Sequence, residues 1–187
     1  SVCPTGQYQD STTGEAACVS CAAGKYRNGA AASSAEDTAC TACASGTYQD
    51  QAAQLSCASC ATGKYRDTGQ LASTVESVAC KACTLGTTYQ NQEAQTSCKA
   101  LSAVCQAGKH TSVAATLTSD RTCANCASGA WKVADTGYNV TSCAAWSTCP
   151  VGKGQDNTPS TTTDRTCADC ATGYFSAAKN GLVCASH

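Results

Sequence analysis

The eighteen cysteines of this chain alternate between two kinds from one end of the sequence to the other. Every second cysteine opens a Cys-x-x-Gly motif, and the nine cysteines between them never do. A register of this kind is typical of a tandem array of small loops, each tied at its neck. The openers are Cys3, Cys21, Cys43, Cys60, Cys83, Cys105, Cys126, Cys149 and Cys170.

Large apolar side chains are too scarce to build a conventional hydrophobic core. The 187 residues include no isoleucine or methionine, one phenylalanine, six leucines and ten valines, and the hydrophobic share of 42% is mostly alanine and cysteine. A cysteine content close to a tenth of the chain is typical of secreted disulfide scaffolds. A bridge that closes about 15 residues contributes roughly 3 kcal/mol in the loop-entropy model. We therefore expect cross-links, formed in an oxidising extracellular compartment, to supply the order.

Short and long loops alternate if each opener is joined to the next closer. One short loop plus one long loop spans 40 residues from Cys3 to Cys43, and the same from Cys43 to Cys83. Every long loop begins Cys-x-x-Gly-Lys, and most short loops place an aromatic residue two positions after the glycine. This period divides the chain into repeats 1–40, 41–80, 81–123 and 124–167, followed by a terminal half repeat, 168–187.

The residue types within each loop predict short β-hairpins, many turns and little helix. Glycine after the opener accepts the positive φ of a sharp turn. The aromatic residue that follows lies in a short extended run, such as 7–9 or 64–66, and we expect its ring to pack against the adjacent disulfide. Closing arms such as 73–79 are also expected to be strands. Modules stacked neck to neck would form an elongated ladder in which each touches only its neighbours.

Two spacers, 99–104 and 144–148, are longer than the Cys-x-x-Cys necks of the first half of the chain. A longer spacer permits a bend or a changed twist between modules. Simple drift within a repeat explains the same observation equally well.

Several motifs resemble the cysteine-rich repeats of tumour-necrosis-factor receptors and the related ephrin-receptor-like repeats, over essentially the whole chain. Cys-Pro-Thr-Gly-Gln-Tyr at 3–8 looks like the module that opens a receptor repeat, and Asp-Arg-Thr-Cys at 120–123 and 164–167 looks like the junction between modules. The weakly charged filler rich in Ala, Thr and Ser is also similar to the cysteine-periodic surface antigens of ciliates. The receptors' long module usually carries an additional bridge, whereas each long loop here carries one.

The resemblance implies an extracellular location, an elongated ladder and consecutive disulfide pairing. The implied pairs are Cys3–Cys18, Cys21–Cys40, Cys43–Cys57, Cys60–Cys80, Cys83–Cys98, Cys105–Cys123, Cys126–Cys143, Cys149–Cys167 and Cys170–Cys184.

Zinc is the alternative role for these cysteines, because Cys18-x-x-Cys21 and Cys40-x-x-Cys43 have the spacing of a zinc ribbon. Six cysteines lie outside any Cys-x-x-Cys pair and eighteen do not divide into sets of four, so we expect no metal and no other cofactor. We also expect the chain to have no enzymatic activity. His110 is interpreted as an exposed loop residue, and no known catalytic motif is present.

Charge and hydroxyl patterns bear on partners and modifications. Twelve basic and thirteen acidic residues are scattered, which argues against nucleic acid, and no run approaches the roughly 20 apolar residues of a membrane span. Asn139-Val140-Thr141 is the one N-glycosylation acceptor sequence. The tract 158–163 is either an O-glycosylation site or an ordinary polar turn. Its acceptors would be Thr158, Ser160, Thr161, Thr162 and Thr163.

Trp131, Tyr138 and Trp146 lie in the second half as candidate contacts to another molecule, and packing against nearby disulfides is the simpler interpretation. Taken with the cysteine register, the sequence favours an extracellular structural protein. We expect a glycosylated, disulfide-laddered repeat rod of a cell-surface coat or filament that associates with itself or with other extracellular proteins. The alternative is a receptor-type ectodomain that binds a protein ligand.

Overall fold

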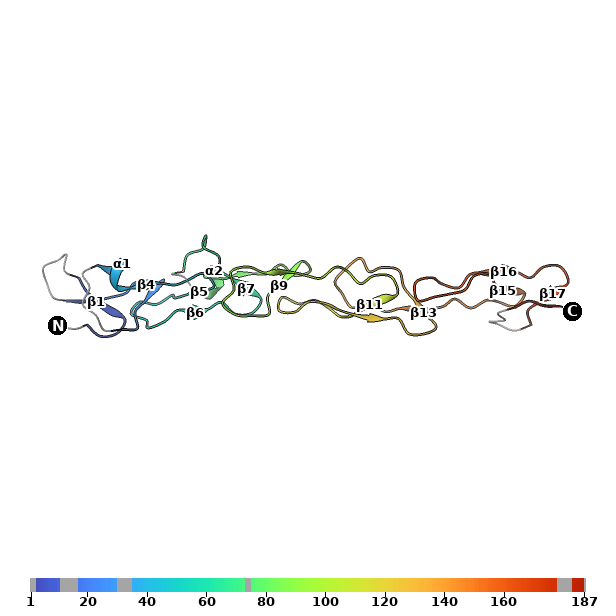
Figure 1. Cartoon of the computed structure of the whole chain (residues 1–187), viewed down its shortest axis with the longest axis horizontal. Helices are drawn as coiled ribbons and strands as arrows, with labels where there is room; N and C mark the ends of the chain where they lie inside the picture. The colour runs from blue at the N-terminus through green and yellow to red at the C-terminus, as the bar shows by residue number, and fades with distance from the viewer. Residues whose placement is uncertain (1–2, 11–16, 30–34, 73–74, 178–182, 187) are drawn as a thin grey trace. The chain divides into compact units, whose positions relative to one another are not determined.

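A computed structural model of the chain describes residues 3–10, 17–29, 35–72, 75–177 and 183–186. The chain divides into two compact units, and Figure 1 labels many of their elements. Unit 1 comprises Ser1–Leu101 with Thr116–Ser119, and unit 2 comprises Ser102–Ala115 with Asp120–His187. The boundary after Leu101 falls inside the first of the two longer spacers.

Antiparallel two-stranded hairpins account for all the strands of the described residues. In each hairpin, the first strand follows the turn glycine and the second begins within one residue of the closing cysteine. The pairs are β1 (Gln7–Gln9) with β2 (Cys18–Ser20), β3 (Lys25–Tyr26) with β4 (Thr41–Ala42), β5 (Thr47–Tyr48) with β6 (Ala58–Ser59), β7 (Lys64–Tyr65) with β8 (Lys81–Ala82), β9 (Thr88–Tyr89) with β10 (Lys99–Ala100), β11 (Lys109–Val113) with β12 (Thr122–Asn125), β13 (Ala130–Trp131) with β14 (Ala144–Ala145), β15 (Lys153–Gln155) with β16 (Cys167–Asp169), and β17 (Tyr174–Phe175) with β18 (Ala185–Ser186).

Each Cys-x-x-Gly motif forms the turn that starts a hairpin. The residue after the glycine donates its backbone N–H to the residue after the cysteine, as Gln7 does to Pro4 at 3.1 Å and Tyr174 does to Ala171 at 2.9 Å. All nine motif glycines have φ between +80° and +87°. A positive φ at the third position is the mark of a type II turn, which favours glycine there. The regular spacing of these glycines in the sequence therefore marks the positions of the turns.

A disulfide closes every hairpin at its base. All eighteen cysteines lie in the described residues and none is free. Each opener is bonded to the next closer, which is the consecutive pairing that the family resemblance implies. The Cα atoms of a pair lie 5.5 to 5.8 Å apart, inside the usual range for disulfides. Within the described residues, the fold is thus a ladder of small disulfide-rich modules, as predicted.

Backbone hydrogen bonds connect successive modules within each unit. An opener that follows a short neck donates its N–H to the turn glycine of the preceding module; Cys21 does so to Gly6 at 2.9 Å and Cys83 to Gly63 at 2.8 Å. In the two longer spacers a spacer residue is the donor instead of the opener: Leu101 donates to Thr87, the residue after the turn glycine, and Trp146 donates to the turn glycine Gly129. These bonds involve only main-chain atoms. The stacking of modules therefore tolerates wide variation in loop sequence.

Aromatic side chains and disulfides form small apolar clusters in place of a core. Tyr8 is 8% exposed and packs with Cys21, Cys40 and Ala39. Tyr48 packs in the same way against the cluster of Cys60, Ala79 and Cys80. The expected packing of aromatic rings on disulfides is confirmed for these two, and the disulfide belongs to the following module.

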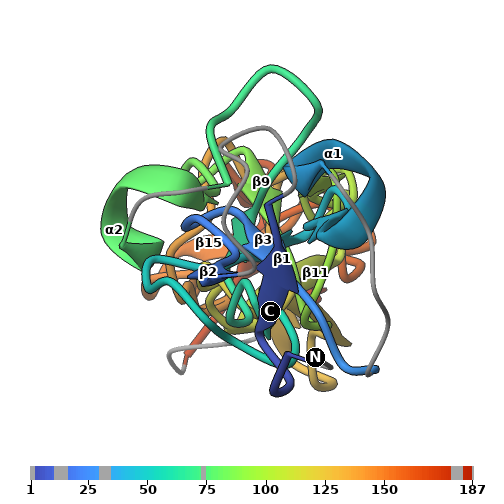
Figure 2. The same ribbon diagram turned by 90° about the vertical axis from the view of Figure 1, so that its left-hand side faces the viewer.

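The expected strand in the closing arm 73–79 is wrong where the arm is described. Residues 73–74 lie outside the described residues, and α2 (Glu76–Ala79) is a single helical turn, matched by α1 (Glu36–Ala39) in the first repeat. Figure 2 shows both helices at the periphery, outside β1 and β3. The turn brings the Glu76 carboxylate to the Ala61 N–H at 3.1 Å and to Lys64 Nζ at 3.4 Å. These tertiary contacts outweigh the local strand preference of the arm.

A buried arginine holds one junction of unit 1. Arg66 is 4% exposed, and its guanidinium donates to the carbonyls of Cys43, Ala44, Thr47 and Gln70. Three of these carbonyls belong to the turn of the preceding module. A planar guanidinium suits this role because it presents several donors in a fixed geometry.

The turn glycines should differ in their tolerance of alanine. In Gly46→Ala, the new Cβ would overlap the Ala94 carbonyl, so we expect a cost larger than the roughly 1–2 kcal/mol of a left-handed alanine. The amide of Cys60 donates to the Gly46 carbonyl, so hydrogen–deuterium exchange at Cys60 measures the local loss.

Two other glycines are the controls for this substitution. Gly129 has the same φ, +85°, but no described atom lies within 4 Å of the place that an alanine Cβ would occupy, so Gly129→Ala isolates the backbone strain. Gly137 has open space and no positive φ, so Gly137→Ala should be neutral. Equal effects of Gly46→Ala and Gly129→Ala would contradict the overlap.

Candidate functional site

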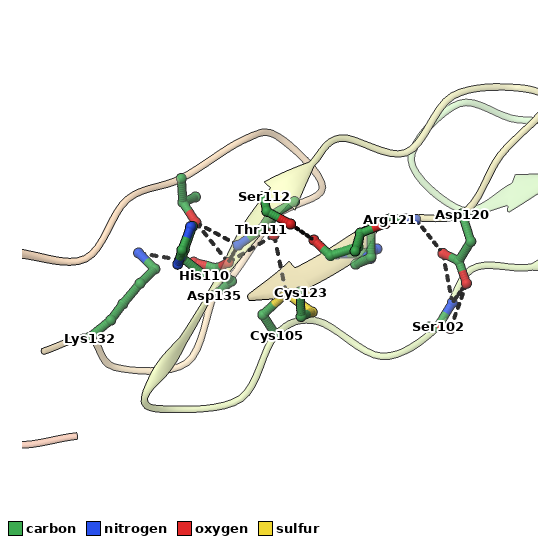
Figure 3. Close-up of a disulfide and its surroundings, with 12 residues drawn as sticks. Ser102, Cys105, His110, Thr111, Ser112, Asp120, Arg121, Cys123, Lys132 and Asp135 are labelled. Atoms are coloured by element: carbon green, nitrogen blue, oxygen red, sulfur yellow. Dashed lines mark hydrogen bonds and ion pairs between the residues drawn. A yellow bond between two sulfur atoms is a disulfide. The ribbon is translucent and has the colours of Figure 1, made fainter. Parts of the chain in front are cut away.

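The most densely connected polar site joins the modules 105–123 and 126–143 within unit 2 (Figure 3). Asp135 lies on the loop of the second module, and its Oδ2 accepts hydrogen bonds from the Thr111 N–H at 3.0 Å, the Thr111 hydroxyl at 2.9 Å and the Thr141 hydroxyl at 2.9 Å. Its Oδ1 lies 3.0 Å from Lys132 Nζ. We call Thr111, Lys132, Asp135 and Thr141 the Asp135 network.

Burial makes this network a structural connection. Thr111 is fully buried and Asp135 is 5% exposed. Burial raises the pKa of Asp135, but the hydrogen bonds from Lys132, Thr111 and Thr141 lower it further, to about 2. The carboxylate is therefore charged at neutral pH and is saturated with donors. It holds the two modules together through Thr111.

The position of Asp135 repeats along the chain with different side chains. Its N–H donates to the Cys105 carbonyl at 2.8 Å, just as Ala53 donates to Cys21 and Ala94 to Cys60. The backbone of each of these loops therefore reaches the opener of the preceding module. Only Asp135 adds a carboxylate at that point, so the side-chain network is particular to this junction.

His110 lies against a disulfide in the same region. Its Nδ1 is 3.4 Å from the Sγ of Cys143, and His110, Cys126 and Cys143 offer ligand atoms within 4.8 Å of one another. The two sulfurs are bonded to each other, so they present no thiolate to a metal. The half-buried imidazole thus packs on a disulfide, and its setting is less exposed than the sequence suggested.

In each of the two long modules in the second half of the chain, an acidic residue of the closing arm accepts hydrogen bonds from a residue just before the opener. Asp120 accepts hydrogen bonds from the N–H and hydroxyl of Ser102, and Asp164 does the same for Ser147. Burial raises the pKa of Asp120 and the bonds from Ser102 lower it below its usual range, and the bonds from Ser147 likewise lower the pKa of Asp164. Both aspartates belong to the Asp-Arg-Thr-Cys motifs.

The three aromatic residues proposed as contacts are all half-buried. Trp146 has partners inside the chain, because its indole N–H donates to the Ser160 carbonyl at 2.9 Å and the Arg165 guanidinium lies 5.8 Å from its ring centroid. Trp131 is part of β13, and Tyr138 lies on the loop beyond it. The internal contacts favour a packing role for Trp146.

The residues predicted to carry glycans are all exposed. Asn139 is exposed, and so are the five hydroxyl residues of the tract 158–163. That tract is a turn in which Ser160 donates its N–H to the Thr163 carbonyl at 3.0 Å, and the Thr161 carbonyl accepts the N–H of Lys132 at 3.0 Å. Its backbone is therefore bonded to the preceding module, while its hydroxyl groups remain reachable.

Two open grooves repeat at equivalent places in unit 1. One, of about 430 Å³, is lined by residues that include Tyr26, Thr47 and Leu55. The other, of about 350 Å³, is lined by residues that include Tyr65 and Thr88. Neither set of lining residues includes a histidine or a group of acidic residues, so we assign no catalytic role to either groove. Among the described residues, no helix has the length and apolar character needed to cross a bilayer.

Comparison with known proteins supports the resemblance noted in the sequence. Residues 31–77 match the family described as tyrosine-protein kinase ephrin type A/B receptor-like. A chain in a structure of the human RANKL/OPG complex is similar at 19% identity and a TM-score of 0.30, covering 81% of this chain and 79% of that chain. No curated protein sequence matches this chain. The family match and the nine consecutive disulfides fit cysteine-rich repeats of the tumour-necrosis-factor-receptor and ephrin-receptor-like kind.

Replacing Asp135 should weaken unit 2 in a pH-dependent way. The pKa of Asp135 is lowered from 3.8 to about 2, so its contribution to stability is present above pH 4 and is lost as the pH falls through 2. We expect Asp135→Asn to cost about 2 kcal/mol at pH 6. Urea unfolding followed by tryptophan fluorescence, at pH 6 and at pH 2, measures both effects.

Asp156→Asn is the matched control, because Asp156 is exposed and lies outside the network. It should leave the unfolding midpoint unchanged at both pH values. The assigned role of Asp135 is incorrect if Asp135→Asn and the unmodified chain lose the same stability between pH 6 and pH 2.

Proposed function

We propose that this chain is an extracellular structural protein, a disulfide-laddered repeat of a cell-surface coat or filament. The observation that carries the proposal is the main-chain connection between modules. Opener and glycine bond to each other at every short neck, so each of these necks has a main-chain connection that does not depend on the side chains of the loops. An array of this kind can be lengthened by adding modules and resists unfolding because each module is separately cross-linked.

The surface chemistry supports the same proposal. The net charge is −1 and charged residues form 13% of the chain, so electrostatic repulsion between copies is weak. Val133 and Val140, each more than 60% exposed, lie on either side of the half-buried Tyr138 in the sequence. We propose that copies associate through this segment of the module 126–143. The proposal includes glycans on exposed hydroxyl and amide groups and no enzymatic activity or cofactor.

Self-association is the property to test first. Electron microscopy and sedimentation of the unreduced chain at several concentrations should show ordered filaments or sheets. Trp131→Ala and Tyr138→Ala should raise the concentration needed for assembly at least several-fold, since aromatic contacts contribute most at protein interfaces. Val151→Ala, at a 62% exposed position in another module, should leave assembly unchanged. Dispersed monomers at every concentration would exclude the structural role.

A receptor-type ectodomain that binds a protein ligand is the second candidate. The family match at 31–77 favours it, since that family is described as receptor-like. Exposed apolar side chains occur at the end of the matched segment and just after it: Leu71 is 72%, Val75 50% and Val78 65% exposed. Apolar side chains on a rigid, cross-linked module are suited to bind a protein partner.

A ligand-binding role predicts a position-specific loss of binding. The unreduced chain, labelled and applied to cells of its source, should bind in a saturable manner, and Leu71→Asp with Val78→Asp should reduce binding at least tenfold. Val183→Asp, at a 78% exposed position in the last module, should bind as the unmodified chain does. Equal binding by all variants would rule out this surface as the ligand site.

A further inference from the structure

The two chemically essential residues of the N-glycosylation acceptor sequence lie in opposite settings. Asn139 is exposed. The hydroxyl of Thr141 donates to Asp135 Oδ2 at 2.9 Å and accepts the Thr111 N–H at 3.0 Å. The Thr141 N–H donates to the Thr111 carbonyl at 3.1 Å. Thr141 therefore belongs to the Asp135 network, and its hydroxyl is occupied as both donor and acceptor.

The neighbouring disulfide fixes Thr141 further. Cys143 follows two residues later and is bonded to Cys126, whose side chain is 7% exposed. Cys126 in turn donates its N–H to Gly108 of the preceding module. The segment that carries the acceptor sequence is thus held on one side by a covalent bond and on the other by β11.

The chemistry of glycan transfer requires the opposite arrangement. An acceptor sequence is defined by the hydroxyl of its third residue as well as by its asparagine, so a transferase must reach both. In the transfer, the amide nitrogen of the asparagine bonds to C1 of the sugar and loses a proton. The bond from C1 to a lipid diphosphate breaks, and the diphosphate leaves. In the closed module, the transferase would have to extract Thr141 from three hydrogen bonds.

We propose that Asn139 accepts an N-linked glycan only while the module 126–143 is open, and that closure of the Cys126–Cys143 disulfide with its Asp135 network ends the modification. The proposal rests on the proposed extracellular role, because secretion would bring the chain to the transferase. A glycan already attached does not oppose closure, since Asn139 itself is exposed. Glycan occupancy at Asn139 then records whether modification or folding came first.

Transfer in vitro tests the proposal separately from any role in a coat or receptor. The full chain, produced without glycans, is supplied with purified oligosaccharyltransferase and a lipid-diphosphate oligosaccharide, either oxidised or reduced and alkylated. Mass spectrometry then measures occupancy at Asn139. We expect transfer to the oxidised chain to be slower by at least about tenfold. Equal rates for the two forms would overturn the proposal.

Two variants distinguish release of the Thr141 hydroxyl from a general effect of unfolding on glycan transfer. Asp135→Ala removes the main partner of Thr141 and keeps all the cysteines, so transfer to its oxidised form should approach the reduced rate. Glu93→Thr creates a second acceptor sequence at Asn91, where both positions are exposed, and Asn91 should be modified equally in oxidised and reduced chains. The proposal is overturned if oxidised Asp135→Ala remains unmodified, or if Asn91 also requires reduction.

Discussion

The neck of each module, where a disulfide meets a glycine turn, is the feature on which the rest of the structure depends. With few large apolar side chains, the chain cannot use a common core to fix the direction of its loops. The disulfide brings two Cα atoms to 5.5–5.8 Å but does not by itself orient the residues after the opener. The turn glycine supplies the orientation, because its positive φ presents its carbonyl to the next opener. The disulfide that closes each loop and the glycine that sets the direction of its backbone therefore lie together at the neck.

The fold was predictable to the extent that it depends on this neck. The Cys-x-x-Gly register predicted turns, hairpins and modules, because cysteine and glycine are the residues whose chemistry the neck requires. The short helices α1 and α2 were not predictable from local propensity. Each owes its helical turn to one glutamate, Glu36 or Glu76, whose carboxylate reaches a backbone N–H in the turn of the same module. A contact across 14 or 15 residues leaves no periodic signal in so short a segment.

The Asp135 network was missed for a related reason. Ala53, Ala94 and Asp135 occupy the same structural place. Ala53 and Ala94 each lie four residues before their closing cysteine, whereas Asp135 lies eight residues before Cys143, so aligning the cysteines does not bring Asp135 into line with the two alanines. The acceptor sequence at Asn139 was visible, whereas the occupation of its Thr141 hydroxyl depends on Asp135 of the same loop and on the Thr111 N–H of the preceding module. Residues within a motif could be identified, and their partners in other modules could not.

The longer spacers accompany a different hydrogen bond between the closing arm and the start of the module, which explains them better than drift within the repeat does. In all four long modules, a carboxylate of the closing arm accepts a backbone N–H near the opener. Where the neck is short, a glutamate on a helical turn reaches the residue after the opener. Where the spacer is long, an aspartate reaches a serine within the spacer, before the opener, and binds its hydroxyl as well. Each arrangement occurs twice, so glutamate accompanies a short neck and aspartate a long spacer in every long module. A short neck with a glutamate and a long spacer with an aspartate are thus two arrangements with the same effect. Each fixes the start of a long module to its closing arm.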